Sequence, residues 1–225
     1  MCEPFIRNHQ YNFIKKQAGI LEQALRTIAD PKVLESVRSG TEAKIVGLFP
    51  NAEDARKQML EEVSALKTAE DFQKYMRTLE PYMAEFPQIT KNQIQKLFPK
   101  NKKLKIPDLT MIDHRYVTYL GWNDAATNKL FIVYPLNGQF IGLEGRFTPT
   151  NKKSFCFLCN RYEELALFSA VSKKRPANAS PDYYKAVGNY LCMNSHECNK
   201  NLTDTSALEK FIESVIGLTG YSYPV

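Results

Sequence analysis

The chain has 225 residues, of which 44% are hydrophobic, and its formal net charge at pH 7 is +6. This length suits one large or two small domains, and the apolar content is sufficient for packed cores. No apolar run approaches the roughly 18 residues of a membrane span, so we expect a soluble protein. The mild positive charge favours acidic partners such as ribosomal RNA or an acidic protein, without deciding between them.

The first 98 residues are expected to form a helical bundle. Apolar residues at three- and four-residue spacing indicate a long first helix that ends at Asp30-Pro31, because proline disfavours a helical conformation in the residue before it. The last helix of the bundle is expected after Thr68-Ala69-Glu70-Asp71, which has the form of a capping box. The helices that follow the first one are expected at about residues 31–39, 41–49, 52–67 and 68–85.

The segment from residue 91 to residue 105 marks a change in composition. It carries six lysines and no acidic residue, and Pro99 and Pro107 bracket its last part. Such a run is either a solvated surface or a docking site for phosphates or an acidic surface. We place the domain boundary here, with the helical bundle in residues 1–98 and a second domain in residues 99–225.

After this boundary the pattern becomes that of strands and ends in a helix. Asn137-Gly138 is the strongest short hairpin signal in the chain, and Leu208, Phe211, Ile212 and Val215 form the apolar side of a helix that runs to Ile216. Strands are expected at residues 115–120, 129–134, 139–147, 162–171 and 184–191. The expected fold class is therefore α+β, with an N-terminal helical bundle and a C-terminal mixed α/β domain.

Four of the five cysteines form two pairs, Cys156 with Cys159 and Cys192 with Cys198. A C-x₂-C turn lets two sulfurs approach one ion, and zinc accepts four thiolates in a tetrahedron. We therefore predict a structural Zn²⁺ site with all four cysteines as ligands, in a treble-clef finger at about residues 151–216. Because such a site has no open coordination position, it argues against a zinc enzyme.

Other uses of these cysteines remain open from the sequence. His196 lies inside the second pair and could replace Cys192 or Cys198 as a ligand. Two disulfides would need an oxidising compartment, but the N-terminus lacks the pattern of a secretion signal, so we expect reduced thiols and a cytoplasmic location. A thioredoxin-like C-x-x-C would not need the second pair of cysteines.

Five short segments, in fixed order and spacing over nearly the whole chain, carry a resemblance. They are His9-Gln10-Tyr11-Asn12, Lys105-Ile106-Pro107, Gly121-Trp122-Asn123, Phe155-Cys156-Phe157-Leu158-Cys159-Asn160 and Cys198-Asn199-Lys200-Asn201-Leu202-Thr203-Asp204. Together they resemble the FusB-type fusidic-acid resistance proteins. Proteins of that family bind elongation factor G and have sometimes been labelled fibronectin-binding.

The resemblance implies a C-terminal domain that holds elongation factor G and drives the factor, with GDP, off a ribosome where fusidic acid has trapped it. Two aromatic contact positions of the family fall on Tyr190 and Phe211, although Phe211 also fits the apolar stripe of the last helix. A lysine of the family falls on Val187, and Lys185 is the nearest basic residue. Elongation factor G is thus the expected partner, the ribosome is involved indirectly, and a monomer is expected.

Release of a trapped factor needs no catalytic residue, because differential affinity for one state of a partner shifts an equilibrium by itself. The sequence has no triad spacing and no glycine-rich phosphate loop, so an enzyme is not expected. The alternative function is a zinc-finger module that binds RNA or the ribosome without the factor, through Lys100–Lys105 and Lys173–Arg175. A surface adhesin would need an export signal, an anchor or repeats, and we find none.

Overall fold

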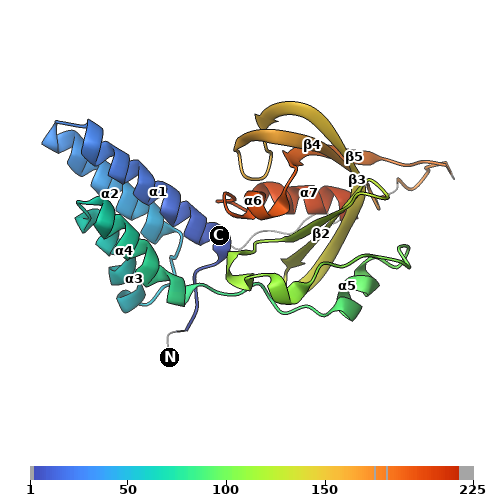
Figure 1. Ribbon diagram of the computed structural model, residues 1–225, viewed down its shortest axis with the longest axis horizontal. Helices are drawn as coiled ribbons and strands as arrows, with labels where there is room; N and C mark the ends of the chain where they lie inside the picture. The colour runs from blue at the N-terminus through green and yellow to red at the C-terminus, as the bar shows by residue number, and fades with distance from the viewer. Residues whose placement is uncertain (1–2, 175, 181, 218–225) are drawn as a thin grey trace. The chain divides into compact units, whose positions relative to one another are not determined.

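The computed structural model describes residues 3–174, 176–180 and 182–217, and it divides into two compact units between Ala84 and Glu85 (Figure 1). The sequence placed this boundary after residue 98. The difference arises because the short helix α5 (Lys91–Leu97) packs on the strands of the second unit. None of the helices in the described ranges combines the length and the apolar character needed to cross a membrane.

The first unit is helical, as the sequence predicts. The capping box at its last helix is present, because Thr68 N donates to Asp71 Oδ2 over 2.8 Å and Asp71 N donates to Thr68 Oγ1 over 3.2 Å. A bridge between Ile6 and Met83 joins the two ends of the unit. Its α-helices are α1 (Asn8–Thr27), α2 (Pro31–Gly47), α3 (Asp54–Glu61) and α4 (Ala69–Leu79), with 3₁₀ turns at Glu62–Ala65 and Glu80–Tyr82.

Two helices expected at 31–39 and 41–49 are one continuous helix, α2. A glycine inside a helix costs only about 1 kcal/mol relative to alanine. Thr41 and Ile45 follow Gly40 on a buried side of the helix, and burying an isoleucine contributes about 1.5–3 kcal/mol. Burial therefore outweighs the local weakness at Gly40.

The second unit contains a five-stranded antiparallel sheet in the order β1-β2-β3-β4-β5. The hairpin at Asn137-Gly138 is confirmed, with φ angles of 51° and 76° and with Leu136 opposite Gln139. The strands are β1 (Leu120–Asp124), β2 (Lys129–Leu136), β3 (Gln139–Phe155), β4 (Tyr162–Val171) and β5 (Ala186–Cys192), and the helices after them are α6 (Ser195–Asn199) and α7 (Ser206–Ile216).

The prediction of a strand at 115–120 is wrong for most of that range. A 3₁₀ turn occupies His114–Tyr116, and β1 begins only at Leu120. The backbone amides of Thr118 and Tyr119 donate to the Asn199 side chain, over 2.7 and 3.1 Å, instead of to a neighbouring strand. A residue distant in the sequence therefore decides the local structure here.

The two faces of the sheet are covered differently, with α7 on one side and α5 on the other (Figure 1). Directly opposed residues share a face, so the register assigns each side chain to one of the two sides. On the first side, Phe168 and Leu191 pack with Phe211 of α7 in the larger core. On the second side, Phe131 and Val133 pack with α5 in a smaller core.

This second side is covered over β1 and β2 but remains exposed towards β5. Its uncovered residues are at least partly accessible, and Tyr190 is 50% exposed. Thr148, Leu167 and Tyr190 are cross-strand neighbours on β3, β4 and β5. Arg146, Ser169 and Gly188 form the adjacent row on the same three strands. We call this surface the open face; it consists of Arg146, Thr148, Leu167, Ser169, Val171, Ala186, Gly188 and Tyr190.

Replacing Gly142 by alanine will destabilise the second unit, because the new Cβ would lie 2.8 Å from Leu97 Cβ and 2.9 Å from the Phe98 ring. The helix α5 must then shift, with an expected loss of about 1–3 kcal/mol. Urea unfolding followed by the fluorescence of Trp122, the only tryptophan, measures this loss. Gly40→Ala is the control, since nothing lies within 4 Å of its new Cβ. An equal loss in both variants would contradict the packing described.

Candidate metal centre

The first cysteine pair lies in the turn that joins β3 to β4. Cys156 N donates to Arg161 O, and Asn160 N donates to Cys156 O, each over 2.9 Å. Asn160 has a φ of 55°, a left-handed conformation that asparagine adopts more readily than most residues. This tight turn leaves the side chains of Cys156 and Cys159 buried together.

The second pair spans the end of β5 and one turn of helix. Cys192 is the last residue of β5, and Cys198 lies in α6. Between them, the Asn194 side chain caps α6 by accepting from His196 N over 2.8 Å and from Glu197 N over 3.4 Å. The second pair therefore joins a strand end to a helical turn, whereas the first pair lies within one tight turn.

The four sulfurs converge on one point. All lie within 4.8 Å of one another and all four residues are buried. Cys156 Sγ is 3.9 Å from Cys198 Sγ, and Cys159 Sγ is 3.5 Å from Cys192 Sγ. A tetrahedral ion with bonds of about 2.3 Å separates its sulfur ligands by about 3.8 Å, so the four cysteines fit such an ion.

The same geometry settles two alternatives. The cysteines are not joined as disulfides, since their sulfurs lie well beyond the bond length of about 2.05 Å. His196 is exposed on α6 and does not belong to the cluster of candidate ligands. The four-cysteine set is therefore the one that the structure assembles.

The four sulfurs shift one another's pKa in opposite directions, and interaction with the Cys159 sulfur, followed by those with Cys192 and Cys198, lowers the pKa of Cys156. Interaction with the Cys156 sulfur, followed by that with Cys159, raises the pKa of Cys192 and of Cys198, and burial raises both further. A divalent cation at the centre would reverse this effect, because its charge stabilises the thiolates directly. The donor set thus matches a positive ion of soft character.

Behind the cysteines, Asn199 connects α6 to the start of β1. Its Oδ1 accepts from the amides of Thr118 and Tyr119, and its Nδ2 donates to Tyr119 O over 2.9 Å and to Ser195 O over 3.0 Å. One buried amide therefore satisfies four backbone groups. The sequence did not identify Asn199 as a structural residue. Its position directly after Cys198, a predicted metal ligand, was the one indication that it lies close to the site.

Tyr119 is a second residue that the sequence did not single out. It is 1% exposed. Burial raises the pKa of Tyr119 well above its usual value, and the adjacent Cys198 sulfur adds to the shift. The phenol therefore stays protonated, and a protonated hydroxyl next to a metal thiolate can donate a hydrogen bond to it.

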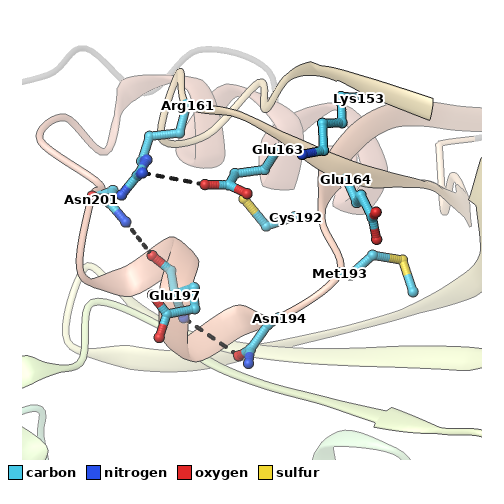
Figure 2. Close-up of a pocket in the computed structure, with 9 residues that line it drawn as sticks. All are labelled: Lys153, Arg161, Glu163, Glu164, Cys192, Met193, Asn194, Glu197 and Asn201. Carbon is cyan, nitrogen blue, oxygen red and sulfur yellow. Dashed lines mark hydrogen bonds and ion pairs between the residues drawn. The ribbon is translucent and has the colours of Figure 1, made fainter. Parts of the chain in front are cut away.

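A pocket of about 350 Å³ adjoins the cysteine cluster and includes Cys192 in its lining (Figure 2). Along its edge, Arg161 pairs with Glu163 at 3.3 Å and donates to Asn201 Oδ1 over 3.1 Å. Asn201 Nδ2 in turn donates to Glu197 O over 2.7 Å. These contacts link the first cysteine turn to α6 independently of any metal.

The other residues that the sequence singled out lie apart from one another. Tyr190 is on the open face, whereas Phe211 is 5% exposed and packs against Phe157 and Phe168 with ring centroids 5.5 and 5.6 Å apart. Lys185 is exposed just before β5. It precedes the strand that carries Tyr190 and is not one of the residues of the open face. The buried Phe211 and the exposed Tyr190 therefore do not form one continuous surface.

Replacing Asn199 by alanine will leave the buried amides of Thr118 and Tyr119 without their acceptor. Each unpaired buried group costs about 1–3 kcal/mol, so we expect a loss of about 2–5 kcal/mol in the free energy of unfolding of the second unit. Urea unfolding followed by Trp122 fluorescence measures it. Asn92→Ala, an exposed asparagine on α5, is the control and should change stability by less than about 1 kcal/mol. Similar losses in the two variants would refute the role of Asn199.

Comparison with known proteins assigns both units to described families. The model for the N-terminal part of elongation factor G-binding protein matches residues 5–87, and the model for the FBP C-terminal treble-clef zinc-finger matches residues 93–214. A search of curated protein sequences found no significant match.

Among solved structures, that of the fusidic acid resistance protein FusC is similar to this chain, with a TM-score of 0.80 and 28% sequence identity. The similarity covers 94% of this chain and 97% of the FusC chain. It confirms the expected fold, with a helical N-terminal region and a C-terminal treble-clef domain built on an antiparallel sheet. The chain belongs to the family of elongation factor G-binding proteins that carry an FBP C-terminal treble-clef zinc finger.

Proposed function

We propose that this protein binds elongation factor G and gives resistance to fusidic acid by releasing the factor, with GDP, from the ribosome. The observation that carries the proposal is the similarity to FusC, which extends over both units and leaves little of either chain uncovered. The matched family description names elongation factor G as the partner. The protein would act in the cytoplasm, as a monomer, where it meets the ribosome through the factor.

The proposed metal is one zinc ion, held by Cys156, Cys159, Cys192 and Cys198. The sulfur separations fit a tetrahedral ion, and the matched family is a zinc finger. With four thiolate ligands the ion has no open position, so its role is structural. It would join the turn after β3 to the end of β5 and to α6, which lie much further along the chain.

The open face is the proposed contact surface for the factor, and Tyr190 is the one aromatic residue among the eight that define it. A half-exposed tyrosine on an uncovered sheet is the type of residue that often contributes strongly to binding, because it buries much area at low entropic cost. The Tyr190 carbonyl accepts from Phe157 N over 3.0 Å, and Phe157 lies between two of the metal ligands. The metal site therefore fixes the backbone that presents Tyr190.

Phe211 is proposed as a positioning residue. Its ring packs on Phe157, whose amide holds the Tyr190 carbonyl, so a change at Phe211 would reach the contact surface through one intermediate residue. Lys185 is proposed as a charge at the rim of the contact. Rim charges act mainly on the rate of association and on its salt dependence.

Release of the factor would follow from differential affinity alone. If this protein binds the released conformation of the factor tenfold more tightly than the trapped one, the equilibrium shifts by about 1.4 kcal/mol towards release. Positioned contacts are then sufficient, and the proposal includes no covalent step.

Cys156→Ser and Cys159→Ser should each reduce the zinc content of the purified protein from about one ion per chain to a small fraction of that. Loss of the metal removes much of the stability of the second unit, so we also expect its cooperative unfolding transition to disappear. Mass spectrometry of the metal and Trp122 fluorescence measure the two effects. His196→Ala is the matched control and should retain the ion; unchanged zinc in both cysteine variants would exclude this site.

Tyr190→Ala should weaken binding of elongation factor G by about 30-fold or more, the effect expected for a central tyrosine of an interface. Calorimetric titration measures the affinity, and unchanged zinc content with an unchanged unfolding transition shows that the variant is folded. Tyr162→Ala is the matched control, because Tyr162 is also more than half exposed but occupies the other side of β4. If both variants bind as tightly as the unaltered chain, the open face is not the contact surface.

A further inference from the structure

The lysines that follow α5 lie on an ordered loop. Asn101 N donates to Phe98 O over 3.0 Å, and Leu104 N donates to Asn101 O over 3.1 Å. Leu104 and Ile106 pack into the smaller core of the second unit. The apolar residues of the loop therefore point inwards, and its exposed cations are Lys100, Lys102, Lys103 and Lys105.

The Asn101 side chain fixes this loop beside the sheet. It donates to Glu144 of β3 and accepts from Lys129 Nζ of β2 over 3.2 Å, and Lys129 also lies 3.5 Å from Glu144. Lys129 is directly opposite Arg146, an exposed residue of the open face. The loop and two strands thus form one surface, which we call the basic strip; it consists of Lys100, Lys102, Lys103, Lys105, Lys129 and Arg146.

The charge of the strip is largely unneutralised. Two carboxylates adjoin the strip, and both lie at Lys129: Glu144 pairs with Lys129, and Asp124 is directly opposite Lys129 and accepts from Ala126 N and Thr127 Oγ1. The ion pairs found within the described ranges include none of the four loop lysines and not Arg146. These cations are therefore available to a partner.

The composition of the strip distinguishes between two classes of partner. Protein interfaces are enriched in aromatic residues, methionine and arginine and are depleted in lysine, and they need an apolar centre. The strip presents mainly lysine, and the neighbouring apolar side chains of the loop are packed inwards. Lysine ammonium groups, as compact point charges, instead suit the phosphates of a nucleic acid backbone.

We propose that the basic strip binds the phosphate backbone of structured RNA. Arg146 belongs to both the strip and the open face. It lies two residues before Thr148, which is in the same cross-strand row as Tyr190. The proposal does not depend on factor binding. If both surfaces are used, however, the same side of the sheet would contact a protein and an RNA, as expected for a partner of a ribosome-bound factor.

The second basic segment that the sequence indicated, Lys173–Arg175, is not included in this proposal. Arg175 lies outside the described residues. Lys173 N donates to Val215 O over 2.6 Å, which places that segment against the end of α7 and not on the open face.

The test is anisotropy titration of a labelled RNA duplex of about 20 base pairs with the full chain, in KCl from about 50 to 200 mM. If the five cations other than Lys129, which pairs with Glu144, act, the logarithm of the affinity should fall against the logarithm of the salt concentration with a slope of about −4.5. Lys102→Gln/Lys103→Gln should reduce the magnitude of the slope by about 1 to 2. Lys15→Gln/Lys16→Gln, an adjacent exposed pair on α1, is the control and should leave the slope unchanged.

Three results would overturn the proposal. One is the absence of RNA binding at the lowest salt concentration. Another is an equal loss in the two double variants, which would indicate a general effect of net charge. The third is competition by poly-L-glutamate as effective as that by unlabelled RNA, which would assign the strip to acidic proteins. Unchanged zinc content and an unchanged unfolding transition establish that each variant is folded.

Discussion

The second unit depends on the convergence of two cysteine pairs that lie far apart in the sequence. Cys156 and Cys159 follow β3, Cys192 ends β5, and Cys198 lies in α6, yet their sulfurs lie within 4.8 Å of one another. The sheet brings them together, because β5 pairs with β4 so that Cys192 is opposite Leu165, near the start of β4. Register and ligand geometry must therefore agree, since a slip by one residue would turn the Cys192 side chain to the other face.

The helix α6 extends this constraint across the whole sheet. It follows β5 at one edge, yet Asn199 binds the backbone that leads into β1 at the opposite edge. Gly121 of β1 allows the contact, because a Cβ there would lie 2.8 Å from Ser195 Cβ. The two edge strands are thus linked through one helical turn that also supplies a metal ligand. The cysteine cluster and the start of β1 therefore share the helix α6 as a common support.

The sequence predicts the features that local chemistry determines. Residues 162–171 form a strand with the expected limits, the hairpin at Asn137-Gly138 is present, and the four cysteines that the spacing singles out lie together. The features determined by distant residues could not be predicted in this way. Asn199 binds the amides of Thr118 and Tyr119, which were expected in a strand, and the aromatic partners of α5 move the boundary between the units. The family resemblance places Phe211 and Tyr190 in one contact, but the two residues lie on opposite sides of the sheet.

An open face has an energetic consequence for a unit of this size. A sheet that leaves Leu167, Val171 and Tyr190 at least partly exposed forgoes apolar burial worth about 25 cal/mol per Å², several kcal/mol over such a surface. A small domain has little stability to spare. Zinc bound by four thiolates contributes on the order of 10 kcal/mol to the folding of small domains, which more than offsets this loss. If the proposed zinc is bound, it would allow the sheet to keep one side free for a partner, and the proposed contact surface would be coupled to the metal site through stability as well as through the Phe157–Tyr190 hydrogen bond.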